Sequence, residues 1–275
     1  MANNLTNWVK YIGTQTIPVF NDTIQSVLRL TMDEKSSCKQ LAETILENPA
    51  LTSRVLRVAN SPYYNRCSGQ FTDIRRIVLL IGFKKISEIC LTLSILDSIV
   101  DNKTRKHVYA VSTRSFHAAI QARSIAESYN LRDPEMVYMS ALLYNIGEIS
   151  FWSLTGKTGR LISDLLQQTG IQHEQAEKDI LGITFRELSL GLVSEWKLLE
   201  LLKKALSNPA SLDLNIKAII HGNKIAEAIQ DNTLDFDSIS HKIAKDTDES
   251  PNEIKKKILE NIEITNETYN YYLKN

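Results

Sequence analysis

Two polar side chains interrupt an apolar stretch of the chain at Tyr144 and Asn145. The run Ala141–Leu143 precedes them, and Ile146 and Gly147 follow. A helix at this point would direct both side chains into a shared cavity. Groups that do chemistry in such a cavity ionise near neutral pH or bind a metal, and tyrosine and asparagine do neither readily. The position is therefore either a catalytic centre or the place where one is missing.

The composition is that of a globular protein without a strong charge bias. The chain has 275 residues, 43% of them hydrophobic, which is enough for one large domain or two smaller ones. The 32 basic and 32 acidic residues balance, which removes the usual argument for a nucleic-acid or membrane-surface protein. Three scattered cysteines show neither zinc-site spacing nor a disulfide framework. Without a signal-peptide pattern or a membrane-spanning apolar run, we expect a cytoplasmic protein.

The spacing of the apolar residues predicts an all-α protein. They recur at intervals of three and four positions, and period-2 alternation is scarce. Helix-start signals agree, because Ser37 and Gln40 form a capping-box pattern and Asp133-Pro134 precedes a helix expected to reach Tyr144. The predicted helices cover about residues 5–12, 18–28, 38–47, 49–59, 74–80, 83–99, 104–129, 134–144, 161–168, 172–181, 185–195, 198–206 and 212–229.

The segment Asn48–Ser61, which reads NPALTSRVLRVANS, resembles the DPxLtxxlLrxaNS signature of the HDOD domain, the HD-related output domain of bacterial signalling proteins. The motif combines a helix started by proline with an Asn-Ser stop, which makes it fairly specific. Other HDOD-like segments are 74–82, which ends at Gly82, 141–147, and 181–185 with Trp196. The resemblance covers about residues 17–206 and continues more weakly to Ile229.

The resemblance implies an all-α fold of two packed helical bundles, with a C-terminal lobe related to HD phosphohydrolases. It divides the chain into a lead helix at 1–16, an HDOD-like domain at 17–230 and a C-terminal helical extension or tail at 231–275. Within the domain, we expect an N-terminal bundle over about 17–103 and an HD-related bundle over about 104–230.

In HD phosphohydrolases a histidine, an adjacent His-Asp pair and a later aspartate hold metal. The resemblance places His117 at the first of these positions, Tyr144-Asn145 at the pair and Asn223 at the late aspartate. Phe185 stands where the family has a further histidine. Metal-assisted phosphoester hydrolysis needs anionic oxygen ligands and neutral imidazoles. We therefore expect no metal, no cofactor and no catalytic residue, only a vestigial pocket formed by these five residues.

The state of that pocket has two interpretations. Asn145 and Asn223 could line a small-molecule site, or they could satisfy each other's hydrogen bonds where aspartates once stood. His117 could likewise belong to the pocket, or it could be a buried histidine hydrogen-bonded within a helix bundle.

A second candidate site lies on the signature helix, where Arg54 and Arg57 stand three residues apart near Asn60. The two arginines could contact a phosphate or an acidic partner. They could equally be solvated or pair with Glu43 or Glu47. Asn60 would then stop the helix and fix the following loop.

These observations favour a non-catalytic regulatory module of bacterial signal transduction that binds a protein partner. One alternative is a metal-dependent phosphohydrolase acting on nucleotides or cyclic dinucleotides, and another is a nucleotide-binding sensor. Nucleic-acid binding and membrane association are not expected, because the charge balances.

Overall fold

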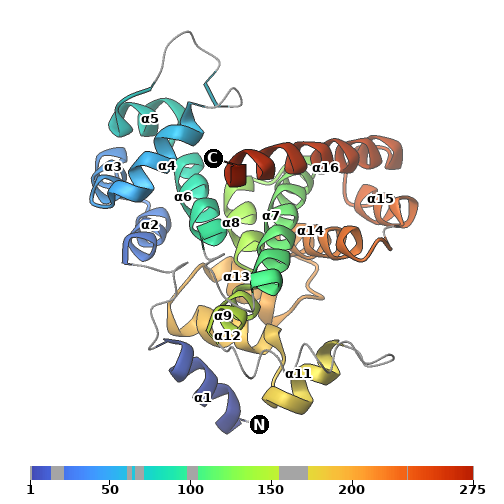
Figure 1. The fold of residues 1–275 in the computed structure, drawn as a ribbon. Helices are drawn as coiled ribbons and strands as arrows, with labels where there is room; N and C mark the ends of the chain where they lie inside the picture. Colours follow the sequence, from blue (N-terminus) through green and yellow to red (C-terminus); the bar gives the residue numbers. More distant parts are fainter. Residues whose placement is uncertain are drawn as a thin grey trace. The chain divides into compact units, whose positions relative to one another are not determined.

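The computed structural model is built from α-helices, and the part of the chain that it describes contains no strand (Figure 1). The described residues are 2–13, 22–60, 64–65, 71–97, 105–154, 173–233 and 235–274. The prediction of an all-α protein is thereby confirmed. Within the described part, no helix combines the length and apolar character that crossing a bilayer requires.

The chain divides into two compact units. The smaller unit comprises Pro18–Ser98 and Tyr272–Asn275, and the larger unit comprises Met1–Ile17 and Ile99–Tyr271. The lead helix expected at residues 1–16 therefore belongs to the larger unit, together with residues 99–271.

The smaller unit is a bundle of short helices. Its helices are α2 (Asp22–Met32), α3 (Cys38–Leu46), α4 (Pro49–Ala59), α5 (Ile74–Ile81) and α6 (Phe83–Asp97). α2 packs against α3 and α6, and α5 packs against α3, α4 and α6. The predicted capping box is present, since the Ser37 hydroxyl accepts from Gln40 N and the Gln40 side chain accepts from Ser37 N at 2.8 Å. Gly82 ends α5 with a φ of +99°, a conformation that favours glycine.

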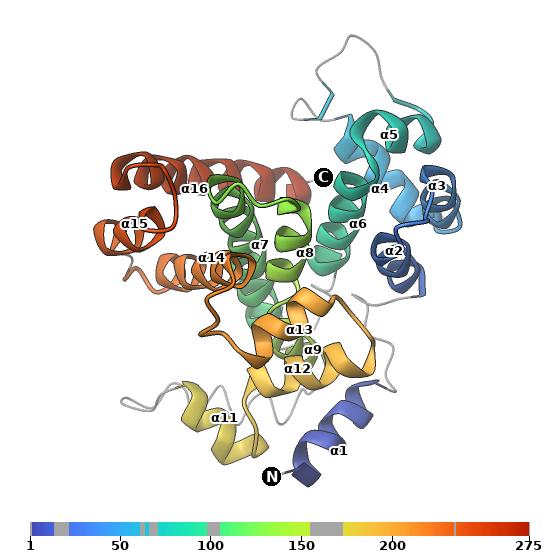
Figure 2. The ribbon, with the colours of Figure 1, turned by 180° about the vertical axis from the view of Figure 1, so that it is seen from behind.

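The larger unit is organised around one long helix, α7 (Figure 2). Its helices are α1 (Ala2–Gly13), α7 (Arg105–Ser128), α8 (Pro134–Leu142), α9 (Ile146–Leu154), α11 (His173–Leu181), α12 (Phe185–Glu195), α13 (Glu200–Ser207), α14 (Leu214–Gln230), α15 (Phe236–Ala244) and α16 (Pro251–Lys274). α7 packs against α8, α9 and α14. A Cβ on Gly222 of α14 would lie 2.5 Å from the Ala118 carbonyl oxygen, so glycine is required for this close approach.

The helix predicted to reach Tyr144 is shorter than expected. α8 ends at Leu142, and Tyr144 and Asn145 lie in the turn that joins it to α9. The prediction of a helical position for this pair is wrong, because Tyr144 N donates to the Ala141 carbonyl at 3.2 Å and closes a tight turn instead. Helix α9 starts directly after this turn, and the apolar spacing did not separate it from α8.

The C-terminal segment packs on the body of the larger unit. The sequence predicted a helical extension or tail over residues 231–275, and in the structure Ile254 and Ile258 of α16 are each only 2% exposed. The Gln121 side chain of α7 donates to the Ile258 carbonyl at 3.1 Å, which connects the two helices. The predictions of a helix start at Pro18, a loop at 155–159 and a helix at 161–168 lie outside the described residues.

Candidate functional site

A cluster of neutral polar side chains includes the two positions, 145 and 223, that the HDOD resemblance assigns to metal-binding carboxylates. The Asn145 amide donates to Asn223 Oδ1 at 3.2 Å and to Ser115 Oγ at 3.3 Å. Asn223 Nδ2 donates in turn to the Ile219 carbonyl at 2.9 Å. We call Ser115, Asn145 and Asn223 the amide cluster. Side chains from α7, from the turn before α9 and from α14 meet in it, so the fold rather than local sequence brings them together.

His117 lies two positions after Ser115 in the sequence and is buried, but it is not part of the amide cluster. Its side chain is 7% exposed, and its Nδ1 has no hydrogen-bond partner among the described residues. Burial lowers the pKa of this imidazole to about 4. His117 is therefore neutral at physiological pH.

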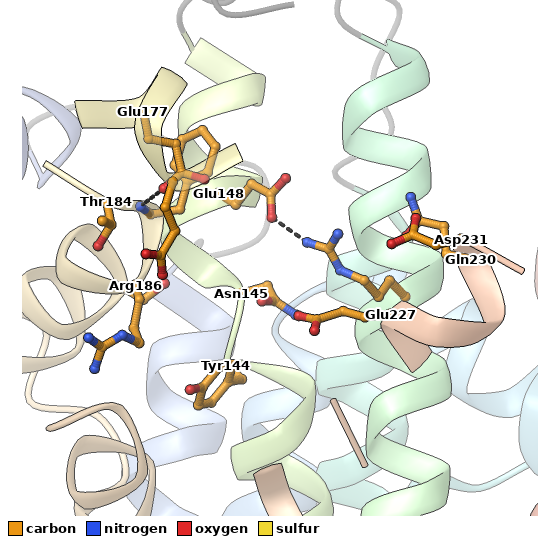
Figure 3. Close-up of a pocket in the computed structure, with 13 residues that line it drawn as sticks. Tyr144, Asn145, Glu148, Glu177, Thr184, Arg186, Glu227, Gln230 and Asp231 are labelled. Carbon is orange, nitrogen blue, oxygen red and sulfur yellow. Dashed lines mark hydrogen bonds and ion pairs between the residues drawn. The ribbon is translucent and has the colours of Figure 1, made fainter. Parts of the chain in front are cut away.

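A cavity of about 430 Å³ opens beside Asn145 (Figure 3). We call it the charged cavity, because five carboxylates and two guanidinium groups line it. Its lining residues are Arg114, Tyr144, Asn145, Glu148, Glu174, Glu177, Thr184, Phe185, Arg186, Ser189, Glu227, Gln230 and Asp231.

An ion pair connects α7 and α9 inside the charged cavity. The Arg114 guanidinium bonds the Glu148 carboxylate, and the two side chains are only 16% and 17% exposed. The Trp152 indole N–H donates to the second oxygen of Glu148 at 3.3 Å. Both oxygens of the Glu148 carboxylate are therefore bound within the protein, one by the Arg114 guanidinium and the other by the Trp152 indole N–H.

Glu177 caps the start of α12 from the other side of the charged cavity. Its carboxylate accepts a hydrogen bond from Phe185 N at 2.7 Å, next to the N-cap residue Thr184. Burial raises the pKa of the Glu177 carboxyl to about 7, against the opposing effect of the Phe185 N–H, and the nearby carboxylates of Glu148 and Glu174 add to the rise. A carboxylate at a helix N-terminus is otherwise favourable, because it faces unpaired backbone N–H groups.

An aromatic wall replaces the family's histidine at Phe185. The Phe185 ring lies 5.2 Å from the Phe151 ring and 6.1 Å from the Trp152 ring, measured between centroids. Burial also raises the pKa of the Tyr144 phenol, so that side chain is a neutral hydroxyl. Neither aromatic residue offers a metal an anionic oxygen or an imidazole nitrogen.

The structure divides the predicted pocket between two cavities. Tyr144, Asn145 and Phe185 line the charged cavity, whereas Asn223 lines a second cavity of about 360 Å³ that shares Tyr144 with the first. His117 lines neither of the two.

The donor set of the site does not fit an HD-type metal. Among the described residues, no group of three or more histidine, cysteine, aspartate and glutamate side chains is arranged to hold a metal ion. Asn145 presents an amide NH₂ to its neighbours, and a bound cation would repel this donor. Of the carboxylates that line the charged cavity, Glu148 forms an ion pair and Glu177 caps a helix.

Asn60, from the second candidate site, joins two segments of backbone. Its side-chain amide donates to the carbonyls of Leu56 at 2.9 Å and Phe71 at 2.8 Å, and its Oδ1 accepts from Phe71 N at 2.7 Å. It thereby ties the chain before α5 to the end of α4. The side chains of Arg54 and Arg57 lie outside the described residues, so their contact with an anion or a partner stays a prediction.

Sequence reasoning missed Arg114 and Glu177. Arg114 stands one helical turn before His117, and this spacing could have indicated a second side chain on the same face of α7. No local pattern pointed to Glu177, because its role depends on how α11 meets α12.

The described part of the chain is an all-α protein of two helical units. The HDOD domain model matches residues 17–210, which is more than half of the chain. The chain therefore belongs to the HDOD family. No curated protein matched it significantly.

Solved structures with the same fold cover nearly the whole chain. An HDOD domain protein with unknown function from Geobacter sulfurreducens superimposes with a TM-score of 0.79 at 19% identity, covering 99% of each chain. A candidate phosphohydrolase from Shewanella amazonensis SB2B gives 0.70 at 18% identity, covering 94% of this chain and 93% of that chain. A candidate signal transduction protein from Marinobacter aquaeolei VT8 gives 0.65 at 16% identity, covering 96% of this chain and 65% of that chain. At these identities the likeness shows the fold alone.

Proposed function

We propose that this chain is a non-catalytic regulatory module of bacterial signal transduction that works by binding a protein partner. The observation that carries the proposal is the hydrogen bond from the Asn145 amide to Asn223 Oδ1 at 3.2 Å. Where a metal hydrolase needs two carboxylates to attract a cation, this chain has two neutral amides that satisfy each other. The signal-transduction name of the Marinobacter relative agrees with this role.

The Arg114–Glu148 ion pair supports the same conclusion. A metal-dependent hydrolase would need Glu148 free to bind a cation or activate water. Here Glu148 is held by a guanidinium and by the Trp152 indole N–H. Releasing it would break an ion pair whose two side chains are largely buried, which is costly.

Metal content tests the proposal directly. Purified full-length protein is incubated with Mn²⁺, Fe²⁺, Zn²⁺ and Mg²⁺, dialysed and measured by plasma mass spectrometry. We expect far less than one metal per chain. The matched control is N145D/N223D, which restores two carboxylates at the amide cluster. Near-stoichiometric metal in the unmodified protein would overturn the proposal.

Hydrolysis of phosphodiesters tests the enzymatic alternative, which the name of the Shewanella relative suggests. A panel of nucleotides and cyclic dinucleotides is assayed with Mn²⁺ for the unmodified protein and for His117→Ala. We expect equal background rates, because His117 lines neither cavity. A rate above background that His117→Ala abolishes would favour the hydrolase.

A nucleotide sensor is the second candidate, since a cavity of about 430 Å³ falls within the size range of small-molecule sites. Its charge opposes the idea, because five carboxylates would repel a phosphate and only two arginines would attract it. We expect no rise in melting temperature with a nucleotide panel. A clear rise would support the sensor, since a ligand that prefers the folded state stabilises it.

A further inference from the structure

Helix α5 has a second apolar face that its own unit does not cover. Ile74, Ile77 and Val78 are buried where α5 packs against α3, α4 and α6. Leu79 and Leu80, in contrast, are 71% and 60% exposed. Single exposed leucines are ordinary on protein surfaces, but adjacent ones form a patch that water solvates poorly.

Two arginines extend this patch. Arg75 and Leu79, like Arg76 and Leu80, are separated by four positions, so each arginine lies one helical turn before a leucine on the same side of α5. Both arginines are exposed, and neither forms an ion pair with a described residue. We call Arg75, Arg76, Leu79 and Leu80 the α5 strip.

The α5 strip is held in a fixed conformation. The Asp73 carboxylate caps the start of α5 by accepting from Arg75 N at 2.9 Å, and Gly82 closes its end by donating to the Val78 carbonyl at 3.0 Å. Asn60 fixes the backbone at Phe71, just before α5. A rigid surface loses little conformational entropy when it binds, which favours recognition.

We propose that the α5 strip docks an acidic amphipathic segment of a protein partner. This inference rests on the proposed function, since it names the chemistry of the partner that such a module would bind. Carboxylates on the partner would pair with Arg75 and Arg76 through charge-assisted hydrogen bonds. Apolar side chains one turn further along would cover Leu79 and Leu80 and remove them from water.

The arrangement suits a protein better than a lipid surface. A membrane layers charge above apolar chains, so an interfacial helix separates its basic and apolar faces. In the α5 strip, basic and apolar side chains lie on the same face, displaced by one turn of about 5.4 Å along the helix axis. A partner helix with a carboxylate one turn from a leucine has the same displacement. The small size of the patch indicates a transient interaction.

Peptide display on the full-length protein tests the proposal. A library of random peptides of about four helical turns is selected for binding, and recovered peptides are measured by fluorescence anisotropy. We expect enriched sequences to carry Asp or Glu about one turn from Leu, Ile or Phe. Their affinity should fall at least about tenfold in L79S/L80S and in R75E/R76E, as expected for central contacts. Their binding should also weaken with added salt.

Matched substitutions elsewhere control for altered surface properties. Leu212→Ser removes a leucine that is 83% exposed in the larger unit, and Arg132→Glu reverses an exposed charge there. Both should leave peptide affinity unchanged. All four variants should melt at the temperature of the unmodified protein, because the altered side chains are exposed.

Three outcomes would overturn the proposal: no enrichment of peptides, enrichment without an acidic excess, or binding that the α5 variants leave intact. Binding of the protein to vesicles of phosphatidylglycerol and phosphatidylcholine that L79S/L80S abolishes, without peptide binding, would reassign the strip to a membrane. These results are independent of metal content and hydrolysis, so a failure here and a failure of the proposed non-catalytic role are distinguishable.

Discussion

The amide cluster and the charged cavity meet at Asn145, yet they handle polarity in opposite ways. In the amide cluster, neutral side chains satisfy one another, and Asn223 is only 4% exposed. In the charged cavity, carboxylates outnumber guanidinium groups, and several of them reach solvent. The cost of burying an unpaired ion accounts for the difference, because it is largest where helices enclose the group. Across the amide cluster and the charged cavity, charged side chains occur only where a polar partner or solvent is nearby.

Removing Arg114 from the charged cavity is expected to cause the largest loss of stability. We expect Arg114→Ala to lower the free energy of unfolding by about 3 kcal/mol, because it leaves Glu148 largely buried without its cation. Urea denaturation measures the change. The double variant R114M/E148Q should recover part of the loss, since it removes both charges. A loss as large in the double variant as in the single one would contradict the ion-pair explanation.

The amide cluster depends on the close approach of helices α7 and α14. Gly222→Ala should cost about 2 kcal/mol, because the new Cβ would meet the Ala118 carbonyl oxygen at 2.5 Å and push the helices apart. Gly13→Ala is the matched control, since its Cβ would find its nearest neighbours at 3.9 Å. Equal stability of these two variants would show that the contact is not limiting.

A direct probe of the amide cluster is Asn145→Ala. It should cost about 1 kcal/mol, because Asn223 Oδ1 and Ser115 Oγ each lose a donor in a part-buried site. A double-mutant cycle with Asn223→Ala should show coupling of the two side chains. Additive losses would mean that the amides act separately.

The effect of Glu177→Gln is expected to depend on pH, since glutamine can still accept from Phe185 N but cannot ionise. The pKa of Glu177 is raised from 4.5 to about 7 in the folded protein, so its contribution to stability is full below pH 4.5 and is lost as the pH rises through 7. The stability of the unmodified protein relative to Glu177→Gln should therefore fall across this window. Thermal unfolding between pH 4 and 8 measures it, and a constant difference would contradict the raised pKa.

Local sequence was sufficient for most of the helices. The capping box of Ser37 and Gln40 and the break at Gly82 depend on residues a few positions apart, and both are present in the structure. The end of α8 was misplaced because apolar residues continue through Leu143, and a three-residue turn carries no distinct apolar spacing.

The contents of the site depended on long-range packing. The resemblance to HDOD domains predicted that Asn145 and Asn223 lie in one pocket, and in the structure their side chains are joined by a hydrogen bond. The Arg114–Glu148 pair spans 34 positions, and no sequence pattern connects the two. Whether His117 would line the cavity likewise depended on the rotation of α7, which periodicity leaves undetermined.

Helix α1 packs against α9 and α12, so the larger unit is discontinuous in sequence. During translation α1 is synthesised before α12, whose start follows about 170 positions later. At ordinary rates of synthesis, that separation is roughly 10 to 35 s. Throughout this time α1 lacks α12, the helix against which it packs most extensively, although most of the smaller unit is synthesised before α12. The larger unit can therefore complete its packing around α1 only after α12 has been synthesised.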